Sequence, residues 1–415
     1  MNKHYQTIVE NYFKDSSFDM IAPSMGPMNH PFVDPGPQYR GQLWDWDSYF
    51  SVRALIDICE YFKDDPTFDY KTRSRAVGEA AKGCVQIFLD TQLEDGFIPI
   101  MVNSRQLEKG EWAKNHREIN NENQHKPFLC QSALQASKYT NDYSWFDIEK
   151  LVKHVEYYRK NQFHERSGLY IFKSDYMIGV DNNPSVYGFP YSVTGDVYLN
   201  SFMYAELCAL AELLKARNDA RSAEYEAEAE RLKKTVQEEC FDQRDGIYYS
   251  VFVDITNKRT PGWHKGLDIF WKSLPMRIRF AMCFVPMYVG IATDEQTKIM
   301  IERHLLDPKF NSPHGLRSLP TDEKMYTLAA TQDPSNSNGP IWLIYNYIAF
   351  FGLLRMGHRE HAERLCSQMV ENFALDILKN GKTDECYNPE TGEPIMNQSF
   401  LSWNSLIISM LNALK

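Results

Sequence analysis

The sequence predicts an all-α protein in which six helical hairpins close into a double ring, an (α/α)6 barrel, with small β-hairpins in its loops. Helical patterns alternate with long loops along the chain, and a glycine recurs near the ends of helices. The recurring glycines are Gly96, Gly168, Gly246, Gly315 and Gly392, separated by 72, 78, 69 and 77 residues, and a step of 70 residues back from the first reaches Gly26. Such a unit holds two helices of roughly 12 to 20 residues with their connections. We therefore expect one closed domain, residues 1–415, rather than two or three smaller ones.

The inner helices of such a ring should be apolar and the outer helices amphipathic. Residues 199–216 and 222–239 are predicted to form one antiparallel hairpin, and residues 341–356 and 360–375 another. The most apolar runs, residues 280–291 and 341–356, are shorter than a membrane span. Both are therefore predicted to be buried inner helices.

The outer faces and loops show weaker patterns. The charges of residues 224–239 are expected to form a solvated face, because Glu228 and Arg231 lie within helical reach of each other. Strand signals are short, and residues 169–172 and 248–252 are each predicted to form a small hairpin within a loop.

Charge and cysteine usage narrow the classes of partner. A net charge of -10 and a pI near 5.6 argue against binding to nucleic acid or to an anionic membrane, and favour a small neutral or weakly charged ligand. The eight cysteines contain no C-x-x-C pair, which is typical of reduced thiols and implies neither a metal site nor a disulfide framework. Residues 1–16 are too polar for a secretory signal, so a cytoplasmic protein is expected. The oligomeric state stays open.

The most informative segment is Trp44-Asp45-Trp46-Asp47, which places two indole rings and two carboxylates in four consecutive residues. Sugars present apolar C–H faces that lie flat on aromatic rings, and hydroxyls that donate to carboxylates. The alternative is a buried helix start, with Trp for packing and Asp for capping, but two buried acids are costly unless something polar binds there. The segment therefore indicates a monosaccharide site.

Hydrolysis of a glycosidic bond needs one carboxylic acid to protonate the departing oxygen and a second carboxyl group across the sugar ring. The candidates are Asp181 and Glu385, which lie in loop segments of different units. Tyr176, Tyr187 and Tyr191 are near Asp181 in sequence and are expected to desolvate it, which would raise its pKa as an acid requires. The alternatives are an ordinary Asx-turn at Asp181 and a surface carboxylate at Glu385.

Several motifs, in order along the chain, resemble those of the inverting α-glycosidases of glycoside hydrolase family 63 and the related trehalases, particularly the compact bacterial members that hydrolyse mannosylglycerate and glucosylglycerate. The motifs lie at residues 43–48, 95–99, 126–131, 179–184, 196–200, 241–249, 339–342 and 385–392. The resemblance implies an (α/α)6 barrel, with Asp181 as general acid and Glu385 as the base that activates water. Asp384 and Cys386 flank this base where the family often has aromatic residues, and Asn183 stands where a serine is common. Asp384 could also raise the pKa of Glu385 if both are buried.

The same resemblance implies a set of sugar-binding residues and a reaction. The expected substrate contacts are Arg40, Trp44, Asp45, Trp46, Asp47, Gln131, Tyr187, Trp342 and Gln398. The expected activity is hydrolysis of a terminal α-linked glucosyl or mannosyl unit from a small glycoside or oligosaccharide, a glycosylglycerate among them. In inverting enzymes the two carboxyl groups lie about 6.5–9.5 Å apart. No calcium loop, phosphate cradle or nucleotide motif indicates a cofactor.

Two questions stay open at this level. A glycerate carboxylate would need a cation, and the loop candidates are Arg40, His125, Lys126, His264, Lys265 and Arg317. A sugar epimerase or isomerase on the same kind of barrel would instead use histidine bases, for which His264 and His314 are candidates. A non-catalytic sugar-binding protein is the third alternative.

Overall fold

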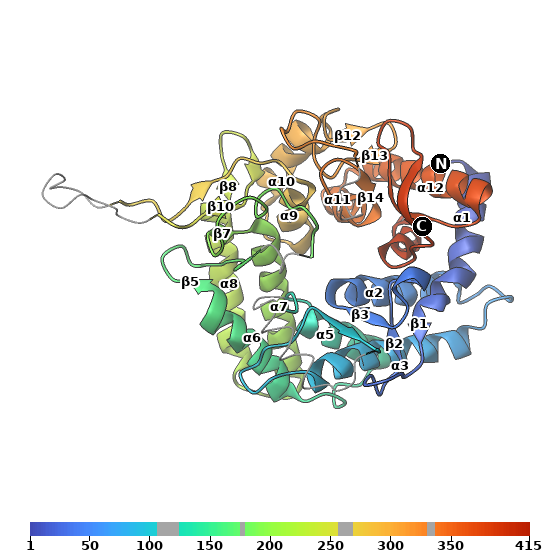
Figure 1. Cartoon of the computed structure of the whole chain (residues 1–415), viewed down its shortest axis with the longest axis horizontal. Coiled ribbons are helices and arrows are strands. Elements are labelled where there is room, and N and C mark those ends of the chain that lie inside the picture. Colours follow the sequence, from blue (N-terminus) through green and yellow to red (C-terminus); the bar gives the residue numbers. More distant parts are fainter. Residues whose placement is uncertain (106–123, 175–178, 256–268, 330–336) are drawn as a thin grey trace, which may run out of the picture.

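The computed structural model describes residues 1–105, 124–174, 179–255, 269–329 and 337–415. Helices dominate the described part of the chain, and the strands are short and belong to sheets of two or three strands (Figure 1). The all-α expectation with small β-hairpins therefore agrees with the structure at the level of secondary structure.

Six described helices surround the centre of the molecule (Figure 1). They are α2 (Asp45–Phe62), α5 (Leu129–Thr140), α7 (Val197–Ala216), α9 (Val285–Val289), α11 (Leu343–Arg355) and α13 (Ile407–Ala413). Each helix contacts the next in this order, and α13 returns to contact α2. These contacts are consistent with the inner ring of the predicted barrel.

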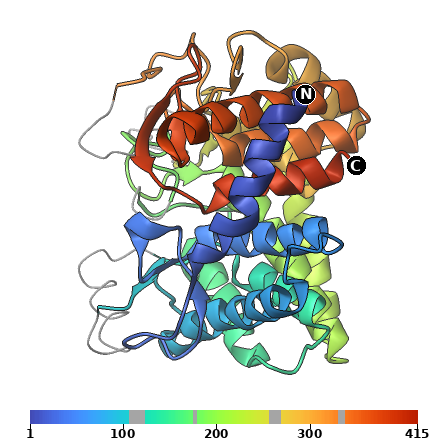
Figure 2. The same ribbon diagram turned by 90° about the vertical axis from the view of Figure 1, so that its right-hand side faces the viewer.

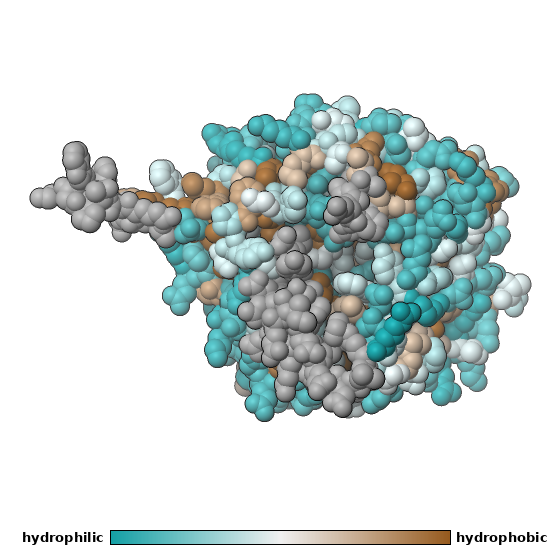
Figure 3. Space-filling model, in the orientation of Figure 1, coloured by the Kyte–Doolittle hydropathy of each residue, from teal (hydrophilic) through white to brown (hydrophobic). Residues whose placement is uncertain are grey.

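A second set of helices lies outside this ring (Figure 1). They are α1 (Lys3–Ser16), α3 (Tyr70–Asp90), α6 (Ile148–Gln162), α8 (Ser222–Glu239), α10 (Asp294–Met300) and α12 (Arg359–Asn380). Helix α10 continues as a π-helical turn, Ile301–Leu305, and 3₁₀ turns cover Ser17–Met20, Pro37–Tyr39, Ala281–Phe284 and Trp403–Leu406. Helix α1 contacts both α12 and α2, so the N-terminal helix lies between the last and first units (Figure 2). The face in Figure 3 is mostly hydrophilic, as expected for charged outer helices.

The two predicted helical hairpins are present. Helices α7 and α8 begin and end within two residues of the predicted bounds, and α12 continues to Asn380, where Gly381 adopts a left-handed φ of 72°. Residues 280–291 form only a 3₁₀ turn and the short helix α9, because Pro286 lies at the helix start and Gly290 ends it with a φ of 85°.

The strands form local hairpins and two larger sheets. The two-stranded pairs are β1 (Ile21–Ala22) with β2 (Phe32–Val33), β3 (Gln42–Trp44) with β4 (Met101–Asn103), β5 (Phe163–His164) with β6 (Leu169–Tyr170), β8 (Phe241–Asp242) with β9 (Ile247–Tyr248), and β12 (Asn311–Ser312) with β13 (Gly315–Leu316). The three-stranded sheets have the orders β11 (Leu274–Pro275), β10 (Val251–Phe252), β7 (Thr194–Gly195), and β14 (Ile341–Trp342), β15 (Asp384–Tyr387), β16 (Pro394–Gln398). All pairings are antiparallel in the described residues.

The recurring glycines mark tight turns. All six, including Gly26, have φ between 56° and 141°, a region that favours glycine. At Gly96 a Cβ atom would also lie 2.3 Å from the backbone oxygen of Lys153 on α6. The repeat seen in the sequence therefore reflects a chain reversal that needs glycine between an outer helix and the next inner segment.

Helix α7 is long and apolar enough to cross a membrane by composition, and 78% of its apolar window is buried inside the protein as part of the inner ring. The helical pattern predicted a solvated face at Glu228, but the residue is only 9% exposed. Its carboxylate accepts from Tyr170 Oη at 2.7 Å and pairs with Arg159 at 2.8 Å. All eight cysteines are unpaired, and only Cys208 is exposed.

Candidate active site

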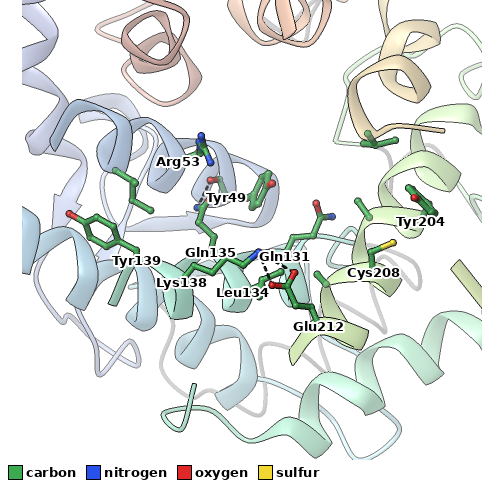
Figure 4. A pocket seen from close by; sticks show the side chains of 14 residues that line it. Tyr49, Arg53, Gln131, Leu134, Gln135, Lys138, Tyr139, Tyr204, Cys208 and Glu212 are labelled. Carbon is green, nitrogen blue, oxygen red and sulfur yellow. Dashed lines mark hydrogen bonds and ion pairs between the residues drawn. The ribbon is translucent and has the colours of Figure 1, made fainter. Parts of the chain in front are cut away.

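A cavity of about 320 Å³ lies where segments preceding several inner helices meet. Its described lining residues are Pro35, Tyr39, Trp44, Trp46, Asp47, Lys126, Gly179, Asp181, Glu385, Phe400 and Trp403. A larger cavity of about 600 Å³ lies among α2, α5 and α7, but its described walls contain one carboxylate, Glu212 (Figure 4). Because general acid and base catalysis on a sugar needs two carboxyl groups, the smaller cavity is the candidate active site.

The tryptophan-rich segment enters this cavity at the junction of β3 and α2. Strand β3 ends at Trp44, and the backbone N–H of Asp45 donates to the carbonyl of Ile100 at 3.0 Å, so the helix begins against the segment before β4. Trp46 is 5% exposed, and its ring lies 5.2 Å from that of Trp403. Aromatic rings from the first and last inner segments therefore form one wall of the cavity.

Asp45 and Lys126 form a buried ion pair behind this wall. Lys126 Nζ lies 2.6 Å from Asp45 Oδ1, with side chains 1% and 0% exposed, and the backbone N–H of Lys126 donates to Asp45 Oδ2 at 2.7 Å. The ammonium also lies 5.9 Å from the centroid of the Trp46 ring. Asp45 thus positions Lys126, and of the two residues only Lys126 is part of the described lining of the cavity.

Asp47 is a buried carboxyl group with a perturbed pKa. Burial, together with the neighbouring charges of Asp45 and Asp181, raises the pKa of Asp47 to about 7 against the opposing effect of Lys126. Ser402 Oγ donates to Asp47 Oδ1 at 3.2 Å. Asp47 therefore changes its charge near neutral pH at the cavity wall.

Asp181 is carried by a tight turn. The N–H of Asn183 donates to the carbonyl of Val180 at 3.1 Å, and Asn182 has a φ of 58°, so Asp181 and Asn182 are the central residues of the turn. Asn183 Nδ2 donates to Asp196 Oδ2 at 3.3 Å, and Asp196 caps the N-terminus of α7. Asp181 therefore lies in a tight turn and also lines the cavity, so a place in a turn does not exclude a place in the site.

Glu385 lies on the central strand of the β14-β15-β16 sheet and is 4% exposed. Asn397 on β16 donates from Nδ2 to Glu385 Oε2. Side chains alternate along a strand, so Asp384 and Cys386 point to the opposite face. Burial raises the pKa of Asp384 to about 6, with a further contribution from Asp376. The effect of Asp384 on Glu385 itself stays a prediction.

Asp181 and Glu385 also share a neighbour. Burial raises the pKa of Tyr345 on α11 above its usual range, and the charges of Asp181 and Glu385 both add to that rise. Both carboxyl groups therefore lie near one tyrosine as well as in the walls of one cavity.

Several predicted sugar contacts lie elsewhere. Arg40 donates to Asp34 at 3.2 Å and to the carbonyl of Asp19 at 2.8 Å, which fixes the loop behind the wall. Gln131 donates to the carbonyls of Pro127 and Phe202 and faces the larger cavity. Neither residue belongs to the described lining of the smaller cavity, so their contact with a sugar stays a prediction.

Three further predicted contacts are also absent from the described lining. Tyr187 is 51% exposed, Gln398 is exposed and accepts from Lys382 Nζ, and Trp342 lies behind the wall with its ring 6.0 Å from that of Trp403. Tyr191 is 62% exposed and Tyr176 lies outside the described residues, so the desolvation of Asp181 by these tyrosines stays a prediction.

The residues predicted as cations or as histidine bases differ in whether they line the cavity. Burial lowers the pKa of His125 to about 3, so this ring is neutral, and Arg317 pairs with Glu390. His314 lies in the β12–β13 turn beside Asn372, at 3.3 Å. His264 and Lys265 lie outside the described residues. Among the described lining residues, Lys126 is the one cation and there is no histidine.

Three aromatic wall residues were missed from the sequence: Tyr39, Phe400 and Trp403. The rings of Phe400 and Trp403 lie 4.7 Å apart and are tilted by 48°, and Tyr39 meets Phe400 edge-on at 6.1 Å. A signal for Trp403 was present, because the segments entering α2, α11 and α13 each carry a tryptophan, as the repeated unit implies.

Comparison with known proteins identifies the family of this chain. Residues 39–403 match the family model for the mannosylglycerate hydrolase MGH1-like glycoside hydrolase domain. Mannosylglycerate hydrolase MGH1 from Selaginella moellendorffii is 31% identical over 112 residues, and this match covers 26% of the chain and 20% of the plant protein. The chain thus spans about a fifth of the length of this relative.

Two solved structures share the fold. The family 63 mannosylglycerate hydrolase from Thermus thermophilus in complex with glucose superposes with a TM-score of 0.65 at 15% identity, covering 98% of both chains. Neutral trehalase Nth1 from Saccharomyces cerevisiae gives a TM-score of 0.60 at 16% identity, covering 98% of this chain and 80% of the trehalase. Because the family model spans most of the sequence, the chain belongs to the MGH1-like glycoside hydrolases.

Proposed function

We propose that the chain is an inverting glycosidase that removes a terminal α-linked glucosyl or mannosyl unit from a small glycoside, using one (α/α)6-barrel domain. The observation that carries this proposal is that Asp181 and Glu385, from segments about 200 residues apart in sequence, line one cavity walled by aromatic rings. A sugar ring between them would have a carboxyl group available on each side.

In the proposed reaction Asp181 protonates the glycosidic oxygen, and Glu385 removes a proton from the attacking water. The water oxygen forms its bond to the anomeric carbon as the bond to the leaving oxygen breaks. Asn397 orients Glu385 through the hydrogen bond to Oε2, and Asp47 accepts from a sugar hydroxyl when it is ionised. We expect the two carboxyl groups to lie about 6.5–9.5 Å apart, as inversion requires.

The substrate is proposed to be small. A cavity of about 320 Å³ suits a single sugar ring, in keeping with the glucose bound by the structural relative from Thermus. A glycosylglycerate is supported by Lys126, whose ammonium would pair with a glycerate carboxylate. This ammonium already pairs with Asp45. A glycerate carboxylate would therefore compete with Asp45 for Lys126, whereas a neutral aglycone would not. The unpaired thiols suit the proposed cytoplasmic location.

The test is hydrolysis of a panel of α-glucosides, α-mannosides, trehalose and glycosylglycerates by the unmodified chain and by Glu385→Gln. Loss of the general base should lower kcat by roughly 10²–10⁴-fold on whichever substrate is cleaved. The matched control is Asp384→Asn, which removes the neighbouring buried carboxyl on the opposite face of β15 and should retain most activity. Release of free sugar that is insensitive to Glu385→Gln, or isomerisation without cleavage, would contradict the proposal.

A further inference from the structure

The larger cavity lies along the flanks of inner helices, away from the loops that build the active site. Its volume is about 600 Å³, and its walls come mainly from α2, α5 and α7 (Figure 4). Tyr49 and Arg53 on α2 are four residues apart, as are Gln131 and Gln135 on α5, so each pair lies on one helix face. Tyr49 and Arg53 lie two and six residues beyond Asp47, which corresponds to about 3 and 9 Å along α2.

Buried aromatic rings separate the two cavities. Phe50, Phe128 and Phe202 are at most 1% exposed, with ring centroids 5.8 Å apart for the first pair and 4.6 Å apart for Phe128 and Phe202. Trp46 of the active site contacts Phe50 at 6.3 Å, and Tyr49 of the larger cavity contacts Phe128 at 5.2 Å. The two sets of described lining residues have no member in common, so the larger cavity is a separate compartment.

The charges at the larger cavity cancel in pairs. Arg53 Nε lies 2.9 Å from Asp57 Oδ2, and Lys138 Nζ lies 2.8 Å from Glu212 Oε1. Both cations are about half-exposed. A small anion would meet a carboxylate beside each cation, so the charge balance favours a neutral ligand.

Uncommitted hydrogen-bonding groups remain on the same walls. Arg53 uses only Nε, and within the described residues Nη1 and Nη2 make no hydrogen bond. Gln135 donates from Nε2 to the carbonyl of Tyr49 at 3.3 Å, while its Oε1 and the Tyr49 hydroxyl have no hydrogen-bond partner in the described part of the chain. The cavity therefore offers donors and acceptors together, beside the rings of Tyr49, Tyr139 and Tyr204.

We infer that the larger cavity is a second, non-catalytic binding site for a neutral sugar or polyol. Hydroxyl groups donate and accept at once, which matches the free guanidinium N–H groups and the free amide oxygen, and the C–H faces of a sugar pack on tyrosine rings. The paired charges at the rim leave no net attraction for an anion. Binding here does not depend on whether the active-site cavity cleaves a glycosidic bond.

Cys208 provides a reporter at this site. Its thiol is exposed and lines the larger cavity on α7, whereas the other seven cysteines are buried (Figure 4). Alkylation of Cys208 by iodoacetamide, followed by peptide mass spectrometry, measures access to the cavity. Partial desolvation by neighbouring atoms raises the pKa of this accessible thiol, so the reaction is run in mild alkali. Glutathione in the same solution corrects for viscosity.

The probe is D-glucose, titrated against the intact chain. A bound sugar should slow alkylation of Cys208, by about tenfold at ten times the dissociation constant, because only the free fraction reacts. Trp44→Ala, which damages the active-site wall, should leave this protection intact. Gln135→Leu should abolish the protection. If Gln135→Leu fails to fold, Tyr49→Phe tests the same site; it removes only a hydroxyl and should weaken the protection.

Three outcomes would overturn the inference. Alkylation of Cys208 could be independent of glucose, the protection could disappear in Trp44→Ala and so report the active site, or sodium acetate could protect as well as glucose does and reveal an anion site. None of these outcomes depends on hydrolysis, so failure of the second site is distinguishable from failure of the proposed glycosidase activity.

Discussion

The two cavities use the same inner helices in different ways. The active-site cavity gathers residues from segments that precede the helices and from the first turn of α2, so Asp47, Asp181 and Glu385 line one space although they are far apart in sequence. The larger cavity is built from helix flanks at four-residue spacing, and Glu212 is the one carboxylate in its described walls. Side chains from different loops can face one another across a cavity, whereas side chains on one face of a helix all point in the same direction. The contrast fits the two proposals, catalysis at the first cavity and binding at the second.

The cavities also differ in how their charges are solvated. The Lys126–Asp45 pair at the active site is 1% and 0% exposed, and the Lys138–Glu212 pair at the larger cavity is 54% and 48% exposed. A buried charge that loses its partner is costly, while an exposed pair contributes little to stability. Substitutions at matched positions in the two cavities should therefore have very different effects.

The largest expected effect is on catalysis. Asp181→Asn removes the proposed acid and should lower kcat by roughly 10²–10⁴-fold on substrates with poor leaving groups. A glycosyl fluoride, whose leaving group needs no proton, should be affected much less. The counterpart in the larger cavity, Gln135→Leu, should leave kcat near that of the unmodified chain. Equal losses on both kinds of substrate in Asp181→Asn would rule out its role as acid.

The next effect concerns stability. Lys126→Met leaves Asp45 buried without its cation and should lower the free energy of unfolding by about 3–5 kcal/mol. Lys138→Met breaks the exposed pair and should cost less than about 1 kcal/mol. Urea unfolding followed by circular dichroism measures both values. Similar losses in the two variants would show that the difference in burial has no energetic consequence.

The third expected effect is a change of stability with pH at Asp47 rather than a fixed loss. Burial raises its pKa from 3.8 to about 7, so between these values the folded state holds a proton that the unfolded state has lost. The free energy of unfolding therefore falls as the pH rises through this range. Asp47→Asn lacks this loss, and its stability relative to the unmodified chain should rise by about 1.4 kcal/mol per unit of the shift, a few kcal/mol in total. Denaturant unfolding at about pH 4 and about pH 8 measures the difference. A constant difference across this range would contradict the raised pKa.

The sequence predicted features that depend on local spacing. The recurring glycines mark turns because a positive φ requires that residue type, and the hairpin of α7 and α8 follows from a strong apolar period. Trp44, Trp46 and Asp47 were found because sugar-binding chemistry is concentrated in one short segment.

Features that depend on tertiary contacts were not predictable in the same way. Glu228 follows a surface pattern on α8, yet it turns inward to pair with Arg159 and Tyr170 on neighbouring elements. Gln131 belongs to the motif region that suggested a sugar contact, but it donates to the carbonyls of Pro127 and Phe202 and lines the larger cavity. That cavity itself has no motif, because its residues are ordinary helix positions brought together only by packing.

The central claim is that two opposed carboxyl groups direct water to the face of the sugar opposite the leaving group. The most direct test is ¹H NMR of the sugar released from an α-linked substrate, recorded before mutarotation. Our account predicts that the β-anomer appears first, with conversion to the α-anomer following slowly. Initial release of the α-anomer would mean retention and would contradict the assignment of Asp181 and Glu385 as an inverting pair.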